Sequence, residues 1–158
     1  MLVVTPLAHD ERMGVGEQWR PWRQLRADPS ITLVLRDGIP GGLRAIRYEM
    51  SGRKVIVIDR NLDPVERLAA LAHELVHDER GGSGHRPDLP PALTVLVTRE
   101  ERRVDRIVAD RLVPLDRLED FAARRMTVGP VTPAMVAAEF GVTEEVAAMA
   151  MERSRRAG

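Results

Sequence analysis

The alternation of apolar and polar positions divides the chain into a sheet-forming first part and a helical remainder. Three short apolar runs are separated by connectors rich in glycine and proline, a pattern typical of strands joined by turns. These runs lie at 31–35, 43–48 and 55–58. We therefore expect a small antiparallel sheet, preceded by a short helix that starts at Pro21. That helix is expected to anchor to the core through Trp19, Trp22 and Leu25.

Segment 63–79 has the most complete helix pattern in the chain. Asp63 suits the N-cap, Pro64 suits the first helical position, and Glu66 completes a capping box with Asp63. Apolar residues recur at helical spacing and predict a buried stripe. These residues are Val65, Leu68, Ala72 and Leu75. We expect the helix to end near Arg80, before two glycines.

Helical patterns dominate the rest of the chain. The stretch 81–91 is rich in glycine and proline and predicts a loop. Helices are expected at 98–112 and 114–125, because apolar positions recur there at helical spacing. Segment 132–155 predicts two further helices joined by a tight turn at Gly141.

These elements predict an α+β fold in which a small antiparallel sheet packs on the helix at 63–79. With 158 residues, the chain can bury a core without disulfides, and 44% hydrophobic and 30% charged residues are ordinary for a globular protein. We expect a first domain over residues 1–128 that carries the chemistry. A C-terminal helical pair is expected over residues 129–158.

Charge and cysteine content exclude several function classes. The 24 basic and 24 acidic residues cancel, so the chain has no global attraction to nucleic acid or to an anionic membrane. There is no cysteine, which excludes disulfides, zinc sites built on cysteine, and thiol catalysis. The first residues lack the pattern of a signal peptide, and no apolar run reaches the length of a membrane helix. We therefore expect a cytoplasmic protein.

The candidate chemistry centres on the sequence HELVH at residues 73–77. Residues four apart on a helix project from the same side, so His73 and His77 can bind one zinc ion at about 2.0–2.1 Å. Glu74 lies within roughly 100° of both histidines around the helix axis, where it can face a metal-bound water without ligating the metal. This is the arrangement of a general base beside zinc-activated water, and it predicts one zinc per chain. The alternative is a helix with two surface histidines and a solvated glutamate.

A catalytic zinc needs a third protein ligand and an open fourth position. The extended pattern that supplies a third histidine would need glycine at position 80 and histidine at position 83. The chain has Arg80 and Ser83 there, so that class of zinc peptidase is excluded. His85 lies in the glycine-rich loop, where nothing in the sequence fixes it. Better candidates lie on the helix expected at 98–112.

Glu101 and Asp105 lie on the inward row of that helix, which otherwise consists of apolar residues. Its apolar members are Val108 and Leu112. Two carboxylates on such a row are costly unless they are partnered. Zinc for Glu101 and a histidine N–H for Asp105 would supply the partners. Glu101 also has a second interpretation, because Thr98-x-x-Glu101 is a capping box that needs no metal. Glu100 is the nearest other carboxylate, but it lies off this row.

Together these residues resemble the ImmA/IrrE family of metallopeptidases over roughly residues 31–114. The resemblance rests on the strand VIVID, the segment LAALAHELVHDERG and the helix EERRVDRIVADRLVP. It implies a gluzincin-like fold in which zinc is held by His73, His77 and Glu101. It also implies that Glu74 is the catalytic glutamate. Members of this family are implicated in cleaving helix-turn-helix repressors of mobile elements, prophages or stress responses, so the resemblance implies such a repressor as substrate.

The C-terminal segment VTPAMVAAEFGVTEEVAAMAMERSRR resembles a helix-turn-helix motif. Small and apolar residues surround Gly141 as that motif requires, and Thr143 suits the N-cap of the second helix. The second helix opens with Glu144 and Glu145, and two acids there would repel the DNA backbone. We therefore expect the pair to serve packing or substrate docking rather than direct nucleic-acid binding.

The sequence thus predicts a zinc-dependent endopeptidase that acts on a protein. Glu74 is expected to take the proton of the attacking water and to pass it to the leaving amine. If the strand at 55–58 is a sheet edge, the substrate can add to it as a further strand. The oxyanion of the transition state needs another donor, for which Tyr48, His85 and Arg80 are candidates.

A rival hypothesis belongs to a different class. In it, the protein is a non-catalytic regulator that holds a repressor or DNA through its C-terminal helical pair, and the zinc site is vestigial or structural. An open coordination position favours the enzyme, whereas a fourth protein ligand such as His85 favours the rival.

Overall fold

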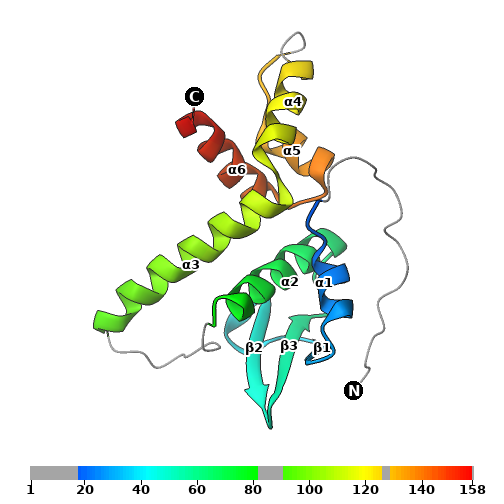
Figure 1. The fold of residues 1–158 in the computed structure, drawn as a ribbon, viewed down its shortest axis with the longest axis vertical. Coiled ribbons are helices and arrows are strands. Elements are labelled where there is room, and N and C mark those ends of the chain that lie inside the picture. Colours follow the sequence, from blue (N-terminus) through cyan, green and yellow to red (C-terminus); the bar gives the residue numbers. More distant parts are fainter. Residues whose placement is uncertain (1–17, 82–90, 126–128, 158) are drawn as a thin grey trace. The chain divides into compact units, whose positions relative to one another are not determined.

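A three-stranded sheet and two α-helices make up the first of two units, and four α-helices make up the second (Figure 1). This is a computed structural model that describes residues 18–81, 91–125 and 129–157, and the counts refer to those ranges. The two compact units are Met1–Pro87 and Asp88–Gly158. The α+β fold class expected from the sequence is confirmed. The domain boundary expected between residues 128 and 129 stays a prediction.

The sheet is mixed, whereas the sequence pattern predicts an antiparallel sheet. β2 (Ala45–Met50) and β3 (Arg53–Asp59) form an antiparallel hairpin, but β1 (Ile31–Arg36) pairs with β3 in parallel. The strand order is therefore β1-β3-β2. The connector from β1, which includes a short 3-10 turn at Pro40–Gly42, carries the chain to the far edge of the sheet. β3 is the central strand, so the condition for a substrate to add to it as an edge strand is not met.

The two faces of the sheet pack against different parts of the first unit. Because residues alternate along a strand, neighbours in β3 point to opposite faces. On one face, Ile56 and Ile58 are fully buried against Leu71 and Leu75 of the following helix. On the other face, Val55 and Val57 pack with Ile39 from the connector between β1 and β2. The first of these two faces supports the helix that carries HELVH.

That helix, α2 (Pro64–Glu79), begins where the sequence places it. The capping box is present in full: the Glu66 N–H donates to Asp63 Oδ1 at 2.8 Å, and the Asp63 N–H donates to Glu66 Oε2 at 3.0 Å. The buried stripe is shifted from the predicted one and is centred on Leu71 and Leu75. The predicted members Val65 and Leu68 are only half-buried.

A short helix, α1 (Pro21–Ala27), holds the end of α2. As predicted, Trp19, Trp22 and Leu25 join the core between the sheet and α2. Two side-chain hydrogen bonds also connect this segment to the last turn of α2. Trp19 Nε1 donates to Gln24 Oε1 at 2.6 Å, and Gln24 Nε2 donates to Glu79 Oε1 at 2.8 Å.

Four helices and no strand are found in the described residues of the second unit. α3 (Pro91–Leu112) begins well before position 98, where the sequence pattern placed its start, and α4 (Leu115–Arg125) follows closely. α5 (Pro133–Phe140) and α6 (Glu144–Ala157) form the expected helical pair. α6 packs on the other three helices of this unit. No helix in the described ranges is long and apolar enough to cross a membrane.

The turn between α5 and α6 has the expected chemistry. Gly141 ends α5 in the left-handed conformation, with φ at 65°, which glycine adopts without strain. The Val146 N–H donates to Thr143 Oγ1 at 3.3 Å, so Thr143 caps α6. α6 buries Ala147 and Ala150 completely. Its later half is tied to α3 by an ion pair between Arg153 and Asp110.

Candidate metal centre

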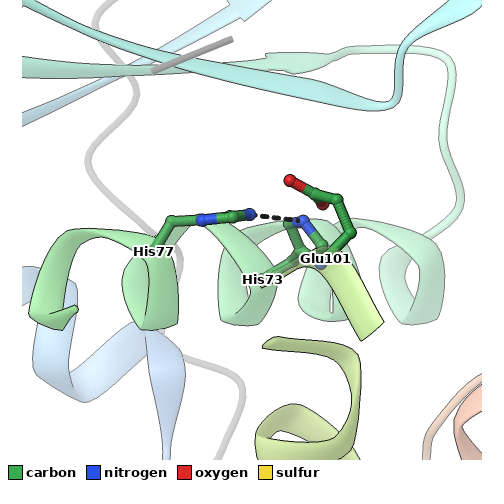
Figure 2. Close-up of side chains that lie close together, drawn as sticks. All are labelled: His73, His77 and Glu101. Carbon is green, nitrogen blue, oxygen red and sulfur yellow. Dashed lines mark hydrogen bonds between the residues drawn. The ribbon is translucent and has the colours of Figure 1, made fainter. Parts of the chain in front are cut away.

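His73 and His77 lie on successive turns of α2 and point to the same side of it (Figure 2). Their Nε2 atoms are 3.1 Å apart, and their ring centroids are 4.7 Å apart. Two nitrogens that share one tetrahedral zinc at the usual bond length are separated by about 3.3 Å. The two imidazoles are therefore already spaced and oriented as two ligands of one metal ion.

The burial of α2 explains why the rings meet at this place. Ala72, Leu75 and Val76 are buried, and the two histidines border them in half-buried positions. The apolar contacts of the stripe fix the rotation of the helix about its axis, and that rotation aims the two rings. An imidazole at such a boundary is accessible to a metal ion but is less strongly hydrated than an imidazole on the surface.

Two imidazole nitrogens and a carboxylate oxygen are ligands that zinc takes in catalytic sites. Among the described residues, the donors that suit a metal ion are those of His73, His77 and Glu101, drawn in Figure 2. Glu74, which is half-buried on α2, does not belong to this set. Its exclusion agrees with the role of a base rather than that of a ligand.

The structure removes the competing interpretation of Glu101. Because α3 begins at Pro91, Thr98 lies inside the helix, where the preceding residues are already helical. An N-cap stands outside the helix it caps, so the capping-box interpretation of Thr98 and Glu101 is wrong. Glu101 and Asp105 are half-buried, whereas Val104 and Val108 beside them are buried. Glu101 and Asp105 therefore lie at the border of the buried stripe of α3.

The three predicted oxyanion donors differ in where the structure places them. Tyr48 pairs with Val55 in the sheet, which places its side chain on the face opposite α2, where it is 41% exposed. The structure therefore does not bring Tyr48 to the histidines. Arg80 is exposed at the C-cap of α2, three residues after His77. His85 lies outside the described residues, as does Ser83.

Comparison with known proteins decides the family. A family model described as "IrrE N-terminal-like domain", of the peptidase family M78, matches residues 30–152. The chain belongs to this family. The match covers well over half of the chain and runs from the turn before β1 into α6. No curated protein and no solved structure matched.

Membership of this family confirms the resemblance to ImmA/IrrE metallopeptidases that the sequence indicates. The match also extends beyond residue 128, where the sequence was expected to change domain. The helical pair α5 and α6 is thus included, almost to its end, in the segment that defines the family.

An ion-pair cluster beside His77 in this M78 domain could not be predicted from the sequence. Asp78 directly follows His77, and its carboxylate accepts from Arg47 Nη1 at 3.3 Å and from Lys54 Nζ at 2.7 Å. Arg47 is only 7% exposed, which is unusual for a charged side chain. The hydrogen bond to Asp78 raises the pKa of Lys54 above its ordinary value. The available signal was small: two cations on neighbouring strands, with an acid in the last turn of the next helix.

Proposed function

We propose that this protein is a zinc-dependent metallo-endopeptidase. The observation that carries the proposal is the pair of Nε2 atoms 3.1 Å apart on the HELVH helix of a chain from a metallopeptidase family. That separation, which a hydrogen bond between the two rings also spans, matches the spacing of two nitrogens that bind one metal ion. We assign Glu101 as the third ligand, because its donor atom suits a metal and its capping role is excluded.

Glu74 is the proposed general base. A bound zinc supplies a Lewis acid for the scissile carbonyl and lowers the pKa of water at the site. Glu74 accepts the proton of the attacking water and delivers it to the departing amine, so that a neutral amine leaves. His73 and His77 hold their positions through the packing of α2 on the sheet. We assign Asp105 to the outer N–H of a ligating histidine, which would fix the tautomer of that ring.

An extended segment of a protein is the proposed substrate. Both edge strands of the sheet, β1 and β2, can in principle accept a further strand through main-chain hydrogen bonds. α2 contacts β2 and β3, so β2 is the edge beside the helix that carries the histidines. We therefore propose that the substrate pairs with β2. The family resemblance suggests a helix-turn-helix repressor as this substrate, and such a substrate implies action in the cytoplasm.

The test uses purified protein, zinc and helix-turn-helix repressors encoded near the gene in its genome. We expect one of them to be cut at a discrete bond, which mass spectrometry of the fragments identifies. A chelator should stop the cleavage, and added zinc should restore it. Glu74→Gln is the matched control, because this protein keeps the metal ligands but lacks the base. Equal cleavage by wild type and Glu74→Gln that a chelator does not stop would show a contaminating protease and remove the support for the proposal.

The rival function, a regulator that binds through its C-terminal helices, finds no specific support. The apolar side of α6 is used inside the second unit, where Ala147 and Ala150 are fully buried. The first turn of α6 presents the exposed acids Glu144 and Glu145. These features favour a packing role for the pair, and we propose that it does not bind nucleic acid directly.

A further inference from the structure

An acid occupies an unfavourable position in α2. Asp78 lies in the last turn, where the helix dipole repels negative charge and where cations are normally found. Its side chain is 11% exposed, so water compensates little of that cost. An acid that is largely buried at a helix C-terminus needs a strong local counter-charge to be tolerated. The chain supplies two counter-charges, one from each strand of the hairpin.

Arg47 and Lys54 reach Asp78 from the same face of the sheet. Arg47 in β2 is paired with Ile56 of β3, and Lys54 precedes Ile56 by two residues. Both side chains therefore leave the face that α2 covers. Arg47 donates to one carboxylate oxygen of Asp78, and Lys54 donates to the other. The last turn of α2 is thus fastened at one side chain to two adjacent strands.

This fastening acts on one histidine more than on the other. His77 directly precedes Asp78 in the last turn of α2, where the final carbonyls lack helical partners and the helix is prone to fray. His73 lies one turn earlier, beside the buried Ala72. The backbone that carries His77 is therefore the part of the histidine pair that depends most on Asp78.

We propose that Arg47 and Asp78 are positioning residues that fix His77 for metal binding. The inference rests on the proposed metallopeptidase function. Neither residue ligates the metal in this proposal. Arg47 acts through Asp78, and Asp78 acts through the turn of helix that it shares with His77. Because Arg47 belongs to the edge strand β2, the same contact links the proposed substrate strand to the metal ligand.

The chain offers a matched control for this ion pair. Arg60 Nη1 and Asp37 Oδ2 are also 3.3 Å apart and also belong to the first unit. Their side chains are 45% and 67% exposed, compared with 8% for Arg47 and 11% for Asp78. Asp37 follows β1, Arg60 follows β3, and neither belongs to α2. Removing the Arg60 pair changes the charge equally but leaves the last turn of α2 untouched.

The experiment compares wild type with Arg47→Met, Asp78→Asn and Arg60→Met as full-length proteins. Zinc affinity is measured by competition with a chromophoric chelator, and the visible spectrum of the cobalt-loaded protein reports the ligand geometry. We expect Arg47→Met and Asp78→Asn each to weaken zinc about 10–100-fold, as losses of groups that orient ligands typically do, and to change the cobalt spectrum. Arg60→Met should match wild type in both measurements. Arg47→Lys, which keeps the charge, should recover part of the affinity.

Folding is checked by circular dichroism at the temperature of the titration, because the loss of a buried arginine can destabilise the first unit. Asp78→Asn is the milder change, since it keeps the size of the side chain and one acceptor oxygen. If either variant is folded and has wild-type zinc affinity and cobalt spectrum, the positioning role is wrong. If Arg60→Met loses as much affinity as Arg47→Met does, the effect is not specific to the last turn of α2 and the inference also fails.

Failure of the proposed function has a different signature. His73→Ala and His77→Ala are included in the same titration. If wild type itself binds no zinc, or if these two variants bind it as well as wild type does, the metal site is wrong and the inference falls with it. If the histidine variants lose zinc while Arg47→Met and Asp78→Asn keep it, only the positioning role is overturned.

Discussion

Glu74 and His73 are neighbours in sequence with different tasks in the proposed site. His73 shares its side of α2 with His77, whereas Glu74 is rotated from it by about 100°. Glu74 is not part of the donor set that suits a metal among the described residues. Adjacent positions on the helix therefore separate the proposed ligand His73 from the proposed base Glu74. Exchanging the Glu74 carboxylate for an amide tests this distinction.

Replacing Glu74 with glutamine should separate metal binding from catalysis. The amide keeps the size of the side chain but cannot accept a proton from water. We expect Glu74→Gln to bind zinc with wild-type affinity and to lose cleavage of a confirmed substrate by at least about 100-fold. Metal analysis of the purified protein and fragment analysis by mass spectrometry check the two parts. Retained cleavage would show that Glu74 is not the base.

Replacing Glu101 with glutamine tests the third ligand. A neutral amide is a poor zinc ligand, so Glu101→Gln should weaken zinc binding strongly and abolish activity. Glu100→Gln is the matched control, because this residue is adjacent on α3 and is also half-buried. A competition titration of both variants beside wild type gives the answer. Wild-type zinc affinity in Glu101→Gln would move the third ligand to another residue.

The residue scale also shows what a sequence can and cannot reveal. The HELVH pattern and Glu101 were predictable, because ligands on one helix follow its periodicity and a carboxylate on an apolar row is conspicuous. The pairing of Arg47 with Asp78 was not predictable. It joins positions in a strand and in a later helix, and its geometry depends on the register of the sheet. Tyr48 was a false candidate for the same reason, since the strand pairing decides which face it occupies.

At the scale of elements, local signals located helices well wherever capping residues were present. α1 begins at Pro21, α2 follows Asp63, and α5 ends at Gly141, as the sequence indicates. The start of α3 was misplaced, because Pro91 was assigned to a loop although proline is favoured in the first turn of a helix. The apolar residues after it lack a polar face, so periodicity gave no boundary there.

Removing the cap of α2 should destabilise the first unit without touching the metal ligands. Asp63→Ala loses the acceptor for the Glu66 N–H, which should lower the free energy of unfolding by about 1 kcal/mol. Asp63→Asn is the matched control, because asparagine caps about as well as aspartate. Urea denaturation of the zinc-free proteins measures both. If Asp63→Ala and Asp63→Asn are equally stable, the capping box makes no net contribution in this fold.

At the scale of the whole molecule, the sheet topology was the main error in the expected fold. Three successive apolar runs with turns between them suggest a meander, yet β1 pairs with β3 and not with β2. The turn at Ser51 and Gly52 has positive φ at both residues and closes the tight hairpin of β2 and β3. The longer connector before β2 permits a crossing that local patterns do not encode. Long-range pairing is decided by the packing of both faces, which becomes visible only in three dimensions.

The proposed ligands are divided between the two units: His73 and His77 belong to the first, and Glu101 belongs to the second. A ligand that binds only the folded protein stabilises every element that supplies a donor, by about 2.7 kcal/mol at 100 times the dissociation constant. We therefore expect zinc to slow amide hydrogen exchange in both α2 and α3 of wild type. In Glu101→Gln the protection of α3 should disappear, and α2 should keep at most a weak effect. Magnesium at the same concentration is the control, because it prefers oxygen ligands and should protect neither helix. Protection confined to α2 in wild type would show that the metal is held by the first unit alone, and it would remove Glu101 from the site.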